Sequence, residues 1–496
     1  MSWNVKKILI YVCVLSCIFM HCNKTFAIEE VNKSTVELKT QENRIIKDGD
    51  NLTLQDCIDI ALQNSPSIKR YKNLVTKANA IIGEAKSSYF PSLQVGTGYY
   101  GSFDKMSGLG TISSNSYNVN ASLSQLIYSF GKVGSLIKKA KLNKIAAEYD
   151  LSYETIKTIY DVKKAYFSVL AAVANLKVQE ATVLIDERNF QQTQAFFEEG
   201  LKSKIDVVNA EVLLSNAKLA YITAQNTYDT AVISLNNAMY IENTPSYSIS
   251  KLESFNFDDN FAEIALKNIE QFSENFKAPE LPKGATYKST VKKYELINQD
   301  YKITKFPLTL DEAEQHAKKY RPDLKSYMSA RDALAQVLKY QKIQLLPDLT
   351  ANGGYSLRTI DTNYNSFNIS GVLSFPVINF MRYKNQIIEA QSDLDVANNQ
   401  VEKLQKDIFF AVQNAYVNMV QLEKKIPLAE VEVRQTFEKL ELALGRYEVG
   451  LGNFLEVNTA INNYNKAQES YVKLIFDYNV ARAKVELEIA QNKQVK

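Results

Sequence analysis

Residues 89–103 read Tyr-Phe-Pro-Ser-Leu-Gln-Val-Gly-Thr-Gly-Tyr-Tyr-Gly-Ser-Phe, and a proline separates two patterns within this stretch. Before Pro91 the pattern is helical, and proline ends a helix because it lacks a backbone donor and restricts the preceding residue. After Pro91 apolar and polar residues alternate, as they do in a half-buried strand. The same helix-to-strand corner recurs at Pro347, and Pro376 marks a further corner beside the last predicted strand.

The corner recurs because the chain contains an internal duplication. Leu52-Thr53-Leu54 returns as Leu308-Thr309-Leu310, a shift of 256 residues, and Gly200-Leu201 returns as Gly450-Leu451, a shift of 250 residues. A constant offset held over more than 100 residues indicates a repeated structural unit. The offset falls by six between Leu93 and Tyr117, which predicts six extra residues in a loop of the first copy.

Both copies have the same predicted order of elements. The first helix of each copy starts with a capping box or a close variant, in which Thr53 or Thr309 lies three residues before an acid. The first repeat, 52–240, is predicted to hold a helix at 54–89, strands at 92–103 and 117–128, a long helix at 133–199 and a return helix at 204–239. The second repeat, 308–492, is predicted to hold a helix at 310–345, strands at 349–358 and 366–378, a long helix at 383–448 and a return helix at 454–492.

The four strands each have one apolar and one polar face. In the third, Leu349, Ala351, Tyr355 and Leu357 oppose Thr350, Asn352, Ser356 and Arg358. The length fits a tilted membrane strand of about 9–11 residues, although a sheet packed on a helix in a soluble protein has the same alternation. Four strands cannot close a membrane barrel, because such barrels begin at about eight strands. The strands must therefore be pooled between chains, and two chains would supply eight strands and three would supply twelve.

The long helices carry a coiled-coil seam. Apolar residues step by three and four along 133–199, which predicts a left-handed supercoil. The second copy repeats this spacing at Ile426, Val433, Phe437, Leu440, Leu444 and Tyr447. Pro427 lies inside this second seam and is expected to kink that helix or to re-pair its neighbours. Gly200 and Gly450 mark turns, so each copy is a hairpin of long helices. The seam of the first copy contains Ile159, Val162, Tyr166, Val169, Val173 and Leu176.

The N-terminal 27 residues have the order of a secretory signal, with basic Lys6 and Lys7, an apolar run and small residues around Ala27. A buried N-terminal helix and lipidation at Cys17 remain as alternatives. Residues 28–51 are polar and predict a flexible leader. Residues 241–307 interrupt the repeat pattern and predict an irregular equatorial insert of unassigned role.

Composition excludes most chemistry. Beyond residue 27 the chain has 55 basic and 55 acidic residues, so it offers no basic footprint for nucleic acid. The same part holds a single histidine, His316, and a single cysteine, Cys57, which cannot form a Cys/His zinc site or a disulfide. We therefore expect no enzyme activity, no cofactor and no metal site.

The ordered set of motifs, present twice, resembles the TolC-type outer-membrane efflux protein family. The motifs include the corner at Tyr89–Leu93, the exit Gln125-Leu126-Ile127-Tyr128, and the turns Glu199-Gly200-Leu201 and Tyr447-Glu448-Val449-Gly450-Leu451. The resemblance implies a mainly helical protein whose trimer pools four strands per chain into one twelve-stranded barrel, with the helices forming a coiled-coil tunnel across the periplasm. It also implies a passive duct for efflux or type I secretion, opened by a periplasmic adaptor and an inner-membrane pump of RND or ABC type.

The resemblance further implies which residues act. The adaptor-docking tip comprises Gly200, Leu201, Tyr447, Val449, Gly450 and Leu451, and the tunnel gate comprises Asp206 and Glu456. The glycines could instead only cap helices, and both acids could only stabilise helix starts. Thr459 and Gly452 stand where related proteins often have a second acid and an arginine. A secreted coiled-coil pore-forming or surface protein without an adaptor is the alternative function, and the sequence does not name the cargo.

Overall fold

The computed structural model describes residues 50–106, 110–242, 247–249, 306–359, 363–375, 380–449 and 451–491, which belong to the unit Gly49–Lys496. The predicted signal peptide, nearly all of the leader and most of the insert lie outside the described residues, as do Gly450 and Pro376. The last leader position, Asn51, lies in the short strand β1 (Asn51–Leu52), which pairs in parallel with β4 (Ser248–Ile249) from the insert.

Each helix predicted before the sheet is in fact two helices. The first copy has α2 (Leu54–Asn64) and α3 (Pro66–Ser87), and the second has α7 (Leu310–Tyr320) and α8 (Pro322–Ile343). The single helices expected at 54–89 and 310–345 are therefore wrong. Pro66 and Pro322 force the residues before them, Ser65 and Arg321, into non-helical backbone with ψ of 117° and 120°. The predicted capping boxes are present at Thr53 and Thr309.

The four strands form one antiparallel sheet in the order β2-β3-β5-β6. Their bounds are β2 (Ser92–Met106), β3 (Gly110–Tyr128), β5 (Asp348–Thr359) and β6 (Asn363–Ser374). The six extra residues of the first copy lengthen β2 and β3 instead of their loop, which corrects the prediction. The polar run 111–116 resembles a loop in composition, yet it pairs with residues 100–105 across the hairpin.

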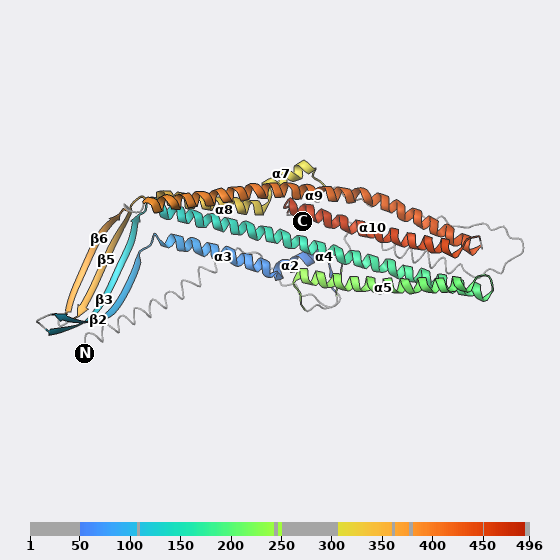
Figure 1. Cartoon of the computed structure of the whole chain (residues 1–496), viewed down its shortest axis with the longest axis horizontal. Coiled ribbons are helices and arrows are strands. Elements are labelled where there is room, and N and C mark those ends of the chain that lie inside the picture. The colour runs from blue at the N-terminus through green and yellow to red at the C-terminus, as the bar shows by residue number, and fades with distance from the viewer. Residues whose placement is uncertain are drawn as a thin grey trace. The chain divides into compact units, whose positions relative to one another are not determined.

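The proline corners lie where helix gives way to strand. Pro91 immediately precedes β2 and Pro347 immediately precedes β5. A buried ammonium joins the two copies there, because Lys132 Nζ donates to the Leu346 carbonyl at 2.7 Å and to the Asp348 carboxylate at 2.9 Å. All four strands lie at one end of the helices (Figure 1).

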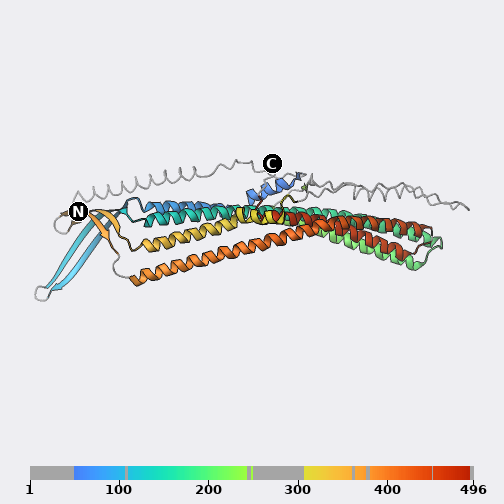
Figure 2. The same ribbon diagram turned by 90° about the horizontal axis from the view of Figure 1, so that it is seen from above.

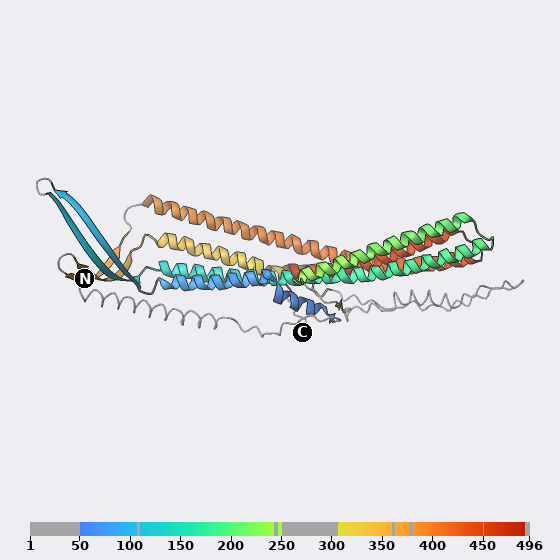
Figure 3. The ribbon, with the colours of Figure 1, turned by 90° about the horizontal axis from the view of Figure 1, so that it is seen from below.

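Two hairpins of long helices make up the rest of the unit. In the first copy α4 (Lys132–Glu198) packs on α5 (Lys204–Met239), and in the second α9 (Phe380–Glu448) packs on α10 (Phe454–Glu488). Helix α9 continues through Pro427 without ending. Helix α10 also packs against α4, so the hairpins lie side by side, as two views show (Figures 2 and 3).

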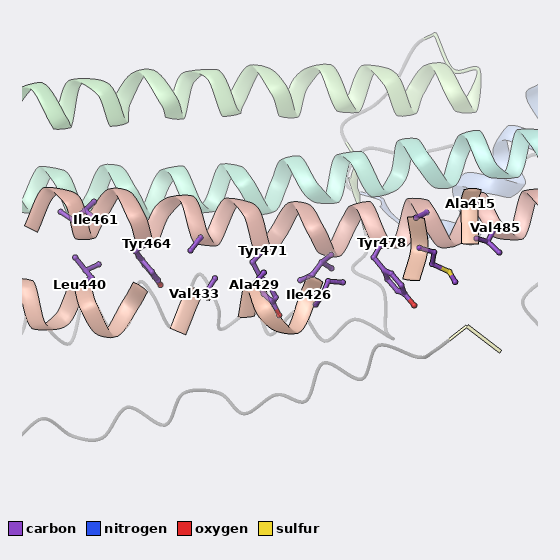
Figure 4. Packing of buried hydrophobic residues seen from close by; sticks show 14 of the residues in the cluster. Ala415, Ile426, Ala429, Val433, Leu440, Ile461, Tyr464, Tyr471, Tyr478 and Val485 are labelled. Atoms are coloured by element: carbon purple, nitrogen blue, oxygen red, sulfur yellow. The ribbon is translucent and has the colours of Figure 1, made fainter. Parts of the chain in front are cut away.

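A hydrophobic core cluster lies mainly between α9 and α10 (Figure 4). Buried residues of α9 recur every seven positions at Ile426, Val433, Leu440 and Tyr447, which is the period of a coiled coil. They meet aromatic residues of α10; the rings of Phe437 and Tyr464 lie 5.3 Å apart. The predicted seam of the second copy is therefore a buried seam over this stretch.

Residues of α7 and of the corner between α7 and α8 bind the C-terminal end of α10. Arg321 and Glu488, both nearly fully buried, form an ion pair, and Asp323 accepts a second bond from Arg321 at 2.9 Å. His316 Nδ1 lies 2.9 Å from the Ile489 carbonyl oxygen. These contacts fix the start of the second repeat to the end of the chain's last helix.

Candidate functional site

The two turns that join the long helices lie together, at the opposite end of the helices from the sheet (Figure 1). Both turns follow directly from local sequence, because each contains a glycine two residues after the last residue of a helix and a capping residue before the next helix begins.

The first turn ends α4 with a Schellman motif. The Leu201 N–H donates to the Phe196 carbonyl at 2.8 Å, and the Gly200 N–H donates to the Phe197 carbonyl at 2.9 Å. Gly200 has φ of 74°, a left-handed conformation that glycine adopts without steric cost. This geometry leaves the Leu201 side chain 64% exposed at the end of the hairpin.

The second turn makes the bond equivalent to that between Leu201 and Phe196, because the Leu451 N–H donates to the Arg446 carbonyl at 2.9 Å. Gly450 itself lies outside the described residues. A Cβ at Gly452 would lie 3.0 Å from the Tyr447 backbone nitrogen, so a side chain there would require the neighbouring backbone to move by a few tenths of an ångström. A glycine therefore fits this turn better than an arginine would, and Leu451 is 76% exposed.

An aromatic cluster joins the two turns. The Tyr447 ring lies 6.5 Å from Phe196 and 6.4 Å from Phe454, and the Lys202 ammonium lies 3.9 Å above it. Tyr447 is only 2% exposed, so it supports the turns from within and offers no surface to a partner. Burial raises the pKa of Tyr447, so the ring stays neutral and the cation–π contact with Lys202 is retained.

Around this buried cluster the turns present an apolar surface, which we call the tip surface. Leu201, Val449 and Leu451 belong to the predicted docking tip, whereas Ile205 and Leu455 do not. Ile205 could have been found from the repeat, because it matches Leu455 at the offset of 250 residues. The tip surface consists of the exposed side chains of Leu201, Ile205, Val449, Leu451 and Leu455.

The two gate candidates occupy equivalent positions but have different partners. The Asp206 carboxylate completes a capping box, accepting from the Ser203 N–H at 3.2 Å and from its hydroxyl at 2.7 Å. The Glu456 side chain does not cap its helix, because Asn453 Oδ1 caps α10 by accepting from the Glu456 N–H at 2.8 Å. The Glu456 carboxylate instead lies 3.5 Å from Arg446 Nε. Asp206 thus caps the start of α5, whereas the Glu456 carboxylate makes no capping bond and can interact with ions at the turn.

Comparison with known proteins identifies this architecture. The family model described as outer membrane efflux protein matches residues 57–239 and 314–491, one stretch in each repeat. The chain belongs to the outer membrane efflux protein family. As a member, it is an outer-membrane efflux channel, and its helical part lies in the periplasm.

Its relatives include channel and secretion proteins. The chain is 23% identical to outer membrane protein TolC of Escherichia coli over 404 residues, covering 80% of this chain and 74% of TolC. It is 26% identical to the alkaline protease secretion protein AprF of Pseudomonas aeruginosa over 181 residues, covering 34% of this chain and 36% of AprF. The structure of CusC, described as a transmembrane channel, matches with a TM-score of 0.71 and 15% identity, covering 90% of this chain and 96% of CusC.

Among the described residues of this family member, one helix, α4, is long and apolar enough over part of its length to meet the criteria for a membrane span. Those criteria use length and composition only, and a core helix of a soluble protein also meets them.

Helix α4 of this efflux protein carries a buried polar stripe that the sequence pattern did not predict. Its members are spaced by three and four residues, like a coiled-coil seam, but they are not apolar. Asp186 Oδ1 and Asn189 Nδ2 are buried and make no hydrogen bond with any described residue. The stripe consists of Gln179, Thr182, Asp186, Asn189 and Thr193.

Asp186 gives the stripe a pH dependence that can be measured. Burial raises the pKa of Asp186 from its ordinary 3.8 to about 6. Because the folded state binds this proton more tightly than the unfolded state, Asp186 lowers stability as pH rises from about 4 through 6. Asp186→Asn is therefore expected to raise the unfolding temperature at pH 8 and to leave it nearly unchanged at pH 3.5, as followed by helical circular dichroism. Glu180→Gln, at an exposed position of the same helix, is the control, and an equal shift at both pH values for Asp186→Asn would contradict this account.

Proposed function

We propose that this chain forms a homotrimeric duct that receives cargo from a periplasmic adaptor at the tip surface and from an inner-membrane pump. The observation that carries the proposal is the four-stranded sheet, which exposes a large apolar face and has two edges, β2 and β6, that pair with no other described strand. Lipid would cover the apolar face, and only pairing between chains satisfies the edges. Three chains supply twelve strands, and the alternating directions let β6 of one chain meet β2 of the next antiparallel.

The height of the apolar face supports a membrane position. Phe90 and Tyr128 lie at the helix end of the sheet. Tyr99 and Tyr117 lie further out along the strands, with their ring centroids 4.9 Å apart. Nine residues separate Phe90 from Tyr99, which is about 30 Å of strand and about 23 Å after a tilt of about 40°. Outer-membrane barrels have an apolar band about 25 Å tall between aromatic girdles. The exposed apolar side chains include Leu93, Val95, Leu123, Phe367 and Ile369.

The helices also carry apolar surface that the single chain leaves uncovered. On α5 the exposed residues step by three, four and seven, which is the spacing of a coiled-coil seam that lacks its partner. On α9 exposed apolar residues recur at intervals of about 7, 11 and 14 residues, which places them on one face of the helix. Neighbouring copies of the chain would bury both stripes. These are Val208, Val212, Leu219 and Ile222 on α5, and Phe410, Val417, Leu428 and Leu442 on α9.

The tip surface supports the adaptor role. Small turns with exposed leucines allow another helical hairpin to approach closely, and burial of these apolar side chains against a partner would stabilise the contact. The similarity to TolC and AprF fits both efflux and type I secretion, so drugs, metals and proteins remain candidate cargoes and the pump can be of RND or ABC type. We propose no cofactor and no catalytic step for this duct.

The gate makes a testable part of this proposal. Three copies of Glu456 would gather at the periplasmic mouth, where like charges attract cations, and Arg446 at 3.5 Å would partly neutralise each. Glu456→Gln is expected to leave trimer yield nearly unchanged and to lower both cation preference and block by multivalent cations in planar bilayers. Arg446→Gln should shift both quantities in the opposite direction.

Single-channel recordings of wild type and both variants decide this. Wild-type protein that forms no conducting channels would contradict the duct itself. Identical selectivity and block in all three proteins would leave the duct standing and would reduce Glu456 to a residue at a helix start.

A further inference from the structure

The polar face of the sheet is built from rows of small uncharged side chains. Residues paired across antiparallel strands share a face, so the strand pairing assigns each row directly. In the middle rows, side-chain amides lie over glycines of the next strand: Asn120 Oδ1 lies 2.8 Å from the Cβ position of Gly96, and Asn118 Oδ1 lies 2.7 Å from that of Gly98. Three rows are Ser92, Ser124, Asn352 and Ser370; Gln94, Ser122, Gly354 and Asn368; and Gly96, Asn120, Ser356 and Ser366.

Arg358 is the exception on this face. It shares the next row with Gly98, Asn118 and Tyr364. Its side chain is exposed, and its guanidinium lies 3.5 Å from the Ser116 hydroxyl.

Arg358 makes no ion pair with a described residue. The other charged side chain described in these strands, Asp348, lies at the helix end and is neutralised by Lys132 at 2.9 Å. Asp104 lies on β2 six residues beyond Gly98, a strand distance of about 20 Å. Among the side chains that the structure describes, Arg358 is therefore a positive charge without an acidic partner, surrounded by neutral polar side chains.

The position of Arg358 along the strand is also defined. It is the tenth residue after Asp348, about 33 Å along β5 and about 25 Å along the membrane normal after tilting. This row lies next to the row of the stacked Tyr99 and Tyr117, which faces the other side of the sheet. Arg358 thus lies at the outer aromatic girdle, on the face that lipid does not cover.

We propose that three Arg358 side chains form a basic ring inside the outer part of the barrel and that this ring binds and concentrates anions that carry carboxylate, sulfate or phosphate groups. The proposal rests on the trimeric duct, because one chain supplies only one guanidinium. Guanidinium groups keep their charge at any physiological pH and match oxyanions in two-point hydrogen bonds. The surrounding Ser, Asn and Gly side chains supply no competing carboxylate in the described rows.

The ring and the periplasmic gate would act at opposite ends of the duct. Glu456 lies at the helical turn and Arg358 at the outer strand end, so the two charges are sampled by ions from different sides. The Debye length is about 10 Å at 0.1 M salt and about 3 Å at 1 M, so the effect of the ring on free ions should be strong only at low salt.

Planar bilayers with oriented channels test the ring, with potassium chloride gradients for selectivity and citrate as the anion probe. In Arg358→Gln we expect the anion-to-cation permeability ratio at 0.1 M to fall by about twofold or more and the difference to shrink at 1 M. Block by citrate added on the outer side should weaken, while block by multivalent cations from the tip side stays unchanged. Ser356→Arg restores a charge two residues along the same face, so Arg358→Gln with Ser356→Arg should regain the anion preference.

Unchanged selectivity and citrate block in a conducting Arg358→Gln channel would overturn the ring and leave the duct intact. If Arg358→Gln does not assemble, Ser356→Arg alone gives the answer, because a second ring must strengthen citrate block and an unchanged block rejects the proposal. A wild-type protein without conductance would overturn both the ring and the duct.

Discussion

Ile369→Arg is expected to abolish assembly in the outer membrane. Ile369 lies in the middle of β6 on the apolar face and is 77% exposed within the chain. An arginine at the lipid-facing midplane of a barrel costs about 2–4 kcal/mol, and a trimer would carry three of them. Oligomer yield in outer-membrane extracts, measured by native gel electrophoresis, should fall below detection.

Ser370→Arg is the matched control, because it adds the same side chain one residue further along the same strand but on the polar face. It should assemble at near wild-type yield. Equal loss in both variants would indicate that β6 tolerates no arginine for reasons unrelated to lipid, and normal assembly of Ile369→Arg would contradict the membrane position of the apolar face.

Leu451→Asp is expected to stop export while trimers still form. Leu451 is 76% exposed at the end of the second hairpin, so an aspartate there is solvated in the free channel and costs the fold little. In a desolvated apolar contact the same unpaired charge costs several kcal/mol, enough to weaken docking by more than about tenfold. Export is measured in cells that depend on this chain, with co-purification of the adaptor and trimer yield from the same cells.

Leu451→Met is the control, because it keeps an apolar side chain of similar volume and should support normal export. Leu201→Asp tests the equivalent position of the first copy. If Leu451→Asp cells export normally with the adaptor bound, the tip surface does not dock the adaptor in the proposed way.

Much of the architecture could be predicted because each element depends on local rules that the sequence states twice. Alternation assigned the faces of all four strands, and the three-and-four spacing on α9 identified residues that are buried in the structure, such as Ile426 and Val433. The offset between copies then transferred each element from one half to the other. Family resemblance added what local rules cannot supply, namely the number of chains and the membrane.

The misses have local physical reasons. Pro66 and Pro322 divide the helices expected at 54–89 and 310–345. The sequence pattern does not reveal these breaks, because a proline at the first turn of a new helix fits the same periodic pattern as one long helix. The serine-rich start of β3 has loop composition, and only its cross-strand partners make it a strand. The tip cluster of Phe196, Tyr447 and Lys202 joins residues about 250 positions apart, which no local pattern can bring together.

The number of chains in the membrane-extracted assembly tests the central claim most directly. Protein extracted from the outer membrane in mild detergent should have the protein mass of three chains, determined by sedimentation with correction for bound detergent. Its circular dichroism spectrum should combine dominant helix with a smaller strand contribution. A stable monomer with the same spectrum, extracted from the outer membrane, would contradict the account, because its sheet would retain two unpaired edges in lipid.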